Sequence, residues 1–214
     1  MAPVDTDAFF FGRVSASYTH EIKNVLATIN EAGGLMQDIL SLEPEKRAGF
    51  LDKLPRSLGV VQEQVERGQH LTSQFNAFAH AADHDPANFD LQDTLEMMVD
   101  LTQRLARRNM VELQVESGVQ TWLTITPVAF LKLLFSSIMW SVSQSEKNST
   151  VGLGAEGQGD SVVISFRVPA LQGGKPQSRE AWEEIEGQAR ALQSQVRWDG
   201  DQGRLLLSLP ARSS

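Results

Sequence analysis

The apolar residues of the first 80 positions recur every three or four residues, in two separate runs. The members of these runs are Tyr18, Ile22, Val25, Ile29, Ala32, Met36 and Ile39, and then Leu54, Leu58, Val61, Val65, Leu71, Phe75 and Phe78. Such spacing places one apolar stripe on each of two long α-helices. A polar break around residues 41–46 separates the runs, which predicts an antiparallel helical hairpin. Because a lone hairpin cannot enclose both stripes, we expect two copies to pair as a four-helix bundle, making the protein a homodimer.

The pattern changes after His84-Asp85-Pro86, and the second part alternates helical and strand-like segments. Helices are expected over 91–108, from Pro127 to about residue 145, and over 179–193. Strands are expected over 110–116, 120–125, 151–156, 161–168, 195–199 and 203–209. The sequence therefore predicts an α+β protein with a helical domain over residues 1–85 and a mixed domain over residues 86–214.

Charge and composition exclude several classes of protein. The chain has 19 basic and 27 acidic residues and a formal net charge of -8, which disfavours a broad nucleic-acid-binding surface. It has no cysteine, so disulfides and thiolate metal sites are excluded. No stretch approaches about 18 uninterrupted apolar residues, and the N-terminus does not have the pattern of a signal peptide. We expect a cytoplasmic protein that neither spans a membrane nor binds nucleic acid.

One histidine stands inside the first predicted helix, in the run His20-Glu21-Ile22-Lys23-Asn24. The run does not continue as the zinc motif H-E-x-x-H, because Asn24 occupies the position of the second histidine. If Ile22 takes heptad position a, His20 falls at f and points to solvent, with Asn24 on the same face. Glu21 falls at g, beside the imidazole and within its reach. On this pattern alone, an outward histidine is more often a plain surface residue.

The surrounding sequence resembles the sensor histidine kinases. His20-Glu21-Ile22-Lys23-Asn24 is similar to their phosphoacceptor motif H-E-hydrophobic-K-N-P-L, with Val25 in place of the proline. The segment QFNAFAH resembles the end of their dimerisation and phosphotransfer domain, and FDLQDTLEMMVDLTQRLARRNMVELQVE resembles the beginning of their ATP-binding domain. The resemblance covers nearly the whole chain. It implies a dimeric helical hairpin followed by a two-layer α/β sandwich of the histidine-kinase ATPase type.

The resemblance also assigns roles to the residues of the motif. His20 would be the phosphoacceptor, since a neutral imidazole has one basic nitrogen that can attack phosphorus. Glu21 would orient the ring or accept its proton, and Asn24 would position water for dephosphorylation of a response regulator. Lys23 would contact phosphate or a partner, although a solvated lysine is an equally good interpretation.

The residues that serve ATP in this family are missing. Where the family has an N-L-L-x-N-A motif, the chain has hydroxyl side chains, Ser137 and Ser141, at the two amide positions. Where the family has D-x-G-x-G, the chain has PALQGGKP over residues 169–176, without an acid. Its Gly173-Gly174-Lys175 lacks the spacing of a phosphate-binding loop and is interpreted as a plain turn. We expect no ATP and no metal bound by this chain, with Mg²⁺ held instead by a partner.

These observations predict a protein of two-component signalling that resembles the phosphotransferases derived from histidine kinases. It would pass a phosphoryl group between His20 and the aspartate of a response-regulator receiver domain, without ATP. The alternatives are a divergent ATP-dependent sensor histidine kinase and a non-catalytic dimeric scaffold that binds a response regulator. The remaining histidines, at positions 70, 80 and 84, and the tryptophans, at positions 122, 140, 182 and 198, are expected to be structural, the latter in the core or an interface.

Overall fold

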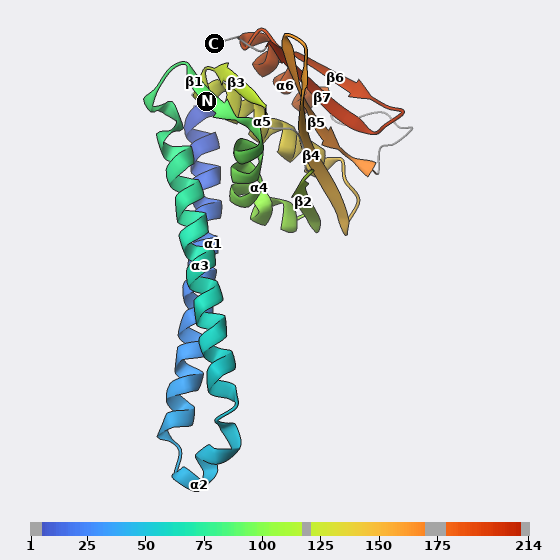
Figure 1. The fold of residues 1–214 in the computed structure, drawn as a ribbon. Helices are drawn as coiled ribbons and strands as arrows, with labels where there is room; N and C mark the ends of the chain where they lie inside the picture. Colours follow the sequence, from blue (N-terminus) through green and yellow to red (C-terminus); the bar gives the residue numbers. More distant parts are fainter. Residues whose placement is uncertain (1–5, 117–120, 170–178, 211–214) are drawn as a thin grey trace, which may run out of the picture.

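The computed structural model describes residues 6–116, 121–169 and 179–210, and it has two parts (Figure 1). A long antiparallel helical hairpin comes first, and a domain of mixed helices and strands packs against its open end. The predicted fold, a helical hairpin followed by an α/β sandwich, is confirmed.

The hairpin consists of α1 (Thr6–Ser41) and α3 (Lys53–His80), joined at the tip by the short helix α2 (Pro44–Arg47) and the 3-10 turn η1 (Ala48–Phe50). Val25 and Ile39 of the first stripe and Leu71 of the second are buried between the helices. Pro55 lies in the first turn of α3, where its missing N–H has no partner to lose. The stripes therefore determine the hairpin, as the sequence predicts.

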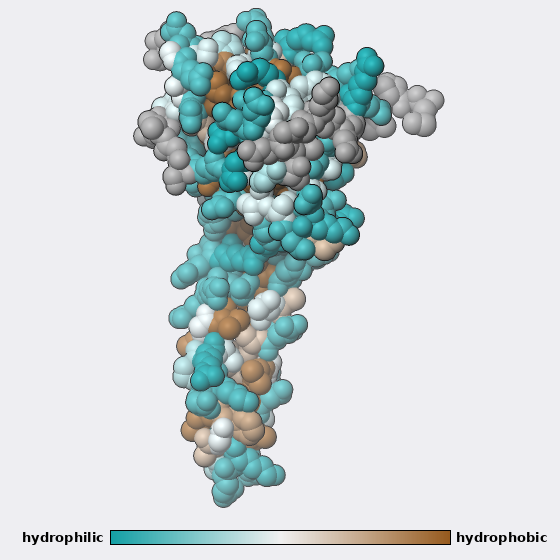
Figure 2. Space-filling model, turned by 90° about the vertical axis from the view of Figure 1, so that its right-hand side faces the viewer, coloured by the Kyte–Doolittle hydropathy of each residue, from teal (hydrophilic) through white to brown (hydrophobic). Residues whose placement is uncertain are grey.

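Apolar side chains on both helices of the hairpin stay exposed in the single chain. Leu26 is 58% exposed on α1, and Leu58 and Val65 on α3 are 49% and 42% exposed. Figure 2 shows hydrophobic side chains at the surface of the hairpin below the mixed domain. The hairpin thus carries an apolar face that its own two helices do not cover.

The mixed domain contains two sheets and three longer helices. Its elements, after the 3-10 turn η2 (Ala81–Asp83), are β1 (Ala87–Asp90), α4 (Leu91–Arg107), β2 (Val111–Val115), β3 (Trp122–Ile125), α5 (Pro127–Ser143), β4 (Ser149–Gln158), β5 (Ser161–Arg167), α6 (Arg179–Ala191), β6 (Gln195–Asp199) and β7 (Arg204–Pro210). The main sheet has the order β2-β4-β5-β7-β6, in which only β2 and β4 run parallel. Strands β1 and β3 form a separate antiparallel pair. Every predicted element of this half is present, and β1 is the one that the pattern missed.

The sheet and the helices enclose one hydrophobic core. Along β5, Val162, Ile164 and Phe166 are buried while the residues between them are partly exposed. The same alternation runs along β7, so one face of the sheet turns toward α4, α5 and α6. The result is a two-layer sandwich whose helical layer also meets the hairpin.

The base of the hairpin joins this core through aromatic rings. Phe10 of α1 is 2% exposed, and its ring lies 5.6 Å from that of Phe78 and 5.3 Å from that of Phe135 on α5. Nearby, Lys132 of α5 donates to Asp7 of α1 over 2.6 Å. Both ends of the hairpin are therefore attached to the sandwich, and the predicted boundary at residues 85 and 86 falls between η2 and β1.

No helix among the described residues is sufficiently long and apolar to cross a membrane.

Candidate functional site

His20 lies on α1, in the half of the hairpin nearer the sandwich. Its side chain is exposed, as heptad position f predicts. Among the described residues it has no hydrogen-bond or ion-pair partner. The imidazole is therefore open to an approaching molecule without displacement of a protein group.

Glu21 turns toward the other helix of the hairpin. Arg67 Nη2 on α3 donates to Glu21 Oε2 over 2.8 Å, and Asn24 Nδ2 donates to Glu21 Oε1 over 3.4 Å. The Glu21 side chain is only 12% exposed. In the described part of the chain, no hydrogen bond joins Glu21 to His20, because neighbouring residues of a helix do not face each other.

The structure thus brings Glu21 and Asn24 together and places His20 on the same stretch of helix, without direct contact to Glu21. Lys23 is exposed, and no partner for it is found among the described residues. The residue that sequence reasoning missed is Arg67. Its signal was available, because residues 21 and 67 lie at nearly mirrored positions about the hairpin tip and carry opposite charges.

This arrangement suits transfer of a group to nitrogen. A neutral imidazole has one ring nitrogen whose lone pair can attack phosphorus. A carboxylate and an amide on adjoining turns supply a proton acceptor and a hydrogen-bonding group that can hold water or a phosphoryl oxygen. The described residues hold no group of three or more His, Asp or Glu that could bind a metal ion.

Helix α5 contains Ser137 and Ser141, the two positions compared above with the amides of the N-L-L-x-N-A motif. Ser137 and Ser141 are both 0% exposed, and Ser141 Oγ donates to the carbonyl oxygen of Ser137 over 2.8 Å. Both side chains therefore turn into the core, and neither lies at a surface where a ligand could bind.

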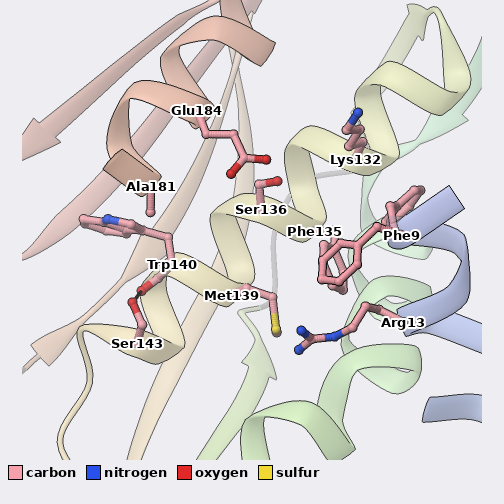
Figure 3. Close-up of a pocket in the computed structure, with 11 residues that line it drawn as sticks. Phe9, Arg13, Lys132, Phe135, Ser136, Met139, Trp140, Ser143, Ala181 and Glu184 are labelled. Carbon is pink, nitrogen blue, oxygen red and sulfur yellow. Dashed lines mark hydrogen bonds between the residues drawn. The ribbon is translucent and has the colours of Figure 1, made fainter. Parts of the chain in front are cut away.

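A cavity of about 380 Å³ lies beside α5, between the start of α1 and α6 (Figure 3). The helix presents to it Lys132, Ser136, Met139, Trp140 and Ser143, which are spaced as one helical face. The cavity wall is accordingly aromatic and aliphatic over much of its area, with Phe135 on the side of α1.

Three of the four tryptophans gather at this side of the domain. Trp140 is 2% exposed, and its ring lies 5.4 Å from that of Trp182 on α6 and 5.7 Å from that of Trp198 on β6. These rings hold α5, α6 and the edge of the sheet together, as the expectation of core tryptophans requires. Trp122 is different, since it is 51% exposed on β3 and belongs to no core.

The charged groups around the cavity have partners within the chain. Lys132 pairs with Asp7, and the Arg13 guanidinium lies 5.5 Å from the centre of the Phe9 ring. Gly173-Gly174-Lys175 and most of the segment compared with D-x-G-x-G lie outside the described residues.

No protein-family model matches the chain, and no curated protein matches it in sequence. Among solved structures it is similar to the Acinetobacter baumannii histidine kinase AdeS, with 11% identity, 91% of this chain and 98% of that chain covered, and a TM-score of 0.47. It is similar to a bacterial phosphotransferase at 15% identity, with 97% of each chain covered and a TM-score of 0.46. For the cytoplasmic segment of histidine kinase QseC, the identity is 17%, the coverage 69% of this chain and 95% of that chain, and the TM-score 0.43. At such identities these similarities concern the fold alone.

Proposed function

We propose that this protein is a dimeric histidine phosphotransferase of two-component signalling, which exchanges a phosphoryl group between His20 and the aspartate of a response-regulator receiver domain without using ATP. The observation that carries the proposal is the exposed His20 imidazole, free of partners among the described residues and followed within four positions by the linked side chains of Glu21 and Asn24.

The proposed step is a displacement at phosphorus. The unprotonated ring nitrogen of His20 attacks the phosphorus of the receiver's aspartyl phosphate, and an N–P bond forms as the P–O bond to the aspartate breaks. The electron pair of that bond leaves with the aspartate, which is released as carboxylate. The proton on the other ring nitrogen passes to the Glu21 carboxylate. The reverse sequence returns the phosphoryl group to a receiver.

Magnesium belongs on the receiver in this proposal, where acidic residues and the transferring phosphoryl group would bind it. Lys23 projects from the same stretch of α1 and is available to a phosphoryl oxygen or to an acidic partner surface. Asn24 shares the face of His20 and would orient a water molecule for hydrolysis of the receiver's aspartyl phosphate. An Asn24→Ala variant should then keep transfer and lose acceleration of that hydrolysis.

The independence from ATP is supported by the shape of the α5 region. Its buried serines, Ser137 and Ser141, offer nothing to a ligand. On the cavity side, the bulky Trp140 forms part of the wall, and Lys132 already pairs with Asp7. A nucleotide entering this cavity would therefore meet aromatic rings over part of the wall and a lysine that is already paired.

The dimer is supported by the uncovered face of the hairpin. A groove of about 450 Å³ runs between α1 and α3, with Leu26 and Val65 among its walls. Pairing with a second hairpin would cover both stripes and complete a four-helix bundle. His20, at the outer heptad position, would remain exposed in such a bundle.

The decisive experiment is transfer of labelled phosphate from a phosphorylated receiver domain to the purified protein, in Mg²⁺ buffer without ATP. We expect acid-labile label on the wild type and none on His20→Ala. His84→Ala, which changes another exposed histidine, should be labelled like the wild type.

The same protein is then given labelled Mg-ATP alone. Label on His20 from ATP would establish the divergent kinase in place of the phosphotransferase. If neither the phosphorylated receiver nor Mg-ATP labels the protein, and the receiver still binds tightly, the protein would be a non-catalytic scaffold.

A further inference from the structure

We infer that Arg67 of α3 is a positioning residue for phosphoryl transfer at His20, acting through the carboxylate of Glu21. The inference rests on the proposed function and deepens it, because it adds a residue of the second helix to a site that the sequence motif places wholly on the first.

The pair is a contact between helices whose residues lie 46 positions apart in the chain. Arg67 Nη2 and Glu21 Oε2 are 2.8 Å apart, and the Glu21 side chain is 12% exposed while that of Arg67 is 46% exposed. A carboxylate covered to this extent requires a charged partner, because it has lost most of its water. Arg67 supplies that partner from the solvent side.

The orientation of the carboxylate follows from its two contacts. Arg67 holds Oε2, and the other oxygen, Oε1, accepts from Asn24 Nδ2 over 3.4 Å. Asn24 follows His20 by four residues, so the two share one face of α1. Arg67 therefore holds Oε2 on the side of α3 and leaves Oε1, the oxygen it does not hold, beside Asn24 on the turn that follows His20.

The helices are held together on both sides of this pair. Gly68, the next residue, lies so near α1 that an added Cβ would stand 3.3 Å from Val25 Cγ1. On the other side, the rings of Tyr18 and Phe75 stack with centroids 4.2 Å apart and planes inclined by 3°. The separation of α1 and α3 at Arg67 and Glu21 is thus set by packing on both sides and does not depend on the ion pair alone.

This geometry assigns Arg67 a specific consequence for the reaction. When the His20 nitrogen attacks phosphorus, the ring gains positive charge and must lose its N–H proton. A carboxylate already directed to that face is ready to take the proton. Without Arg67, the Glu21 side chain would turn out to water, and each transfer would wait for its return.

The test compares Arg67→Ala, Arg67→Lys, Glu21→Gln and the double variant Arg67→Ala/Glu21→Gln, using a phosphorylated receiver as donor. Arg67→Ala should lower kcat about tenfold and leave KM for the receiver unchanged. Arg67→Lys should recover part of the loss, because lysine keeps the charge but not the geometry of the guanidinium. In the Glu21→Gln background, Arg67→Ala should have no further effect.

Arg56→Ala is the matched control, since Arg56 is exposed on the same helix and should not change kcat. Thermal unfolding and light scattering check that each variant is folded and dimeric; if Arg67→Ala is not, Arg67→Gln replaces it in the cycle. An unchanged or raised kcat, a change confined to KM, or an equal loss with and without Glu21 would overturn the inference. Failure of the proposed function has a different signature, because the wild type itself would then take no label.

Discussion

The hairpin and the sandwich bury their residues to very different extents. Helix α3 has 28 residues, of which only Ser57, Leu71 and Phe78 are buried, whereas α5 buries eleven of its 17. The sandwich therefore has a complete core within one chain, and the hairpin does not. The difference indicates that the sandwich is stabilised by its own packing, while the hairpin leaves part of its apolar surface uncovered.

The largest expected effect falls on the loosely packed part. Replacing His20 by Ala should abolish label transfer, because the change removes the proposed phosphoacceptor nitrogen. Since the side chain is exposed, the unfolding midpoint and the oligomeric state should stay those of the wild type. Measurements of label transfer and of thermal unfolding by circular dichroism check both statements. Label remaining on the variant would show that His20 is not the phosphoacceptor.

A substitution in the sandwich should act on stability and not on association. Ile138 is 0% exposed in the core, so Ile138→Ala should lower the free energy of unfolding by about 2–5 kcal/mol. Denaturant titrations at two protein concentrations tenfold apart should give the same loss. A loss that varied with concentration would show that the sandwich also depends on the second copy.

A substitution on the uncovered apolar face of the hairpin should weaken association more than it lowers the stability of the single chain. Leu58 is 49% exposed in the single chain. If a second hairpin covers it, Leu58→Ala should weaken the dimer by about 1 kcal/mol per protomer. Sedimentation equilibrium measures this, and Val60→Ala, on the opposite side of α3, is the control. Equal effects of the two variants would contradict the proposed bundle face.

The smallest effect is expected where α1 and α3 approach most closely. Gly68→Ala should gain helix propensity but press on Val25, which is 3% exposed and has little room to move. We expect a net loss of less than about 1 kcal/mol in unfolding free energy. In a Val25→Ala background the same change should become stabilising, by up to about 1 kcal/mol. Thermal unfolding of the four proteins tests the reversal of sign.

The sequence predictions succeeded where the structure depends on residues close together in the chain, and they failed where it depends on distant ones. The hairpin was predictable because its stripes repeat along single helices, and the exposure of His20 follows from the same register. Strand β1 was missed because it has four residues, and its last, Asp90, also caps α4 by accepting from the backbone N–H of Gln92. Its pairing with β3 depends on residues more than 30 positions away.

The errors at the candidate sites have the same cause. The burial of Ser137 and Ser141 was not foreseen because apolar residues surround most of α5, so the sequence shows little periodicity to separate the core side from the cavity side. For Glu21, the motif suggested a contact with the adjacent imidazole, whereas the structure gives it to Arg67 on another helix. Both features depend on contacts with residues that are distant in the sequence.

The start of α1 and the end of α3 both pack at the sandwich, whereas the tip of the hairpin at α2 projects away from it. His20 lies ten residues beyond the anchored Phe10, about 15 Å along the helix axis at 1.5 Å per residue. The position of His20 along the helix and the direction of its side chain are therefore set by the number of residues between it and Phe10. The tip can grow or shrink over evolution without moving the histidine, whereas one residue inserted between Phe10 and His20 would swing it by about 100°.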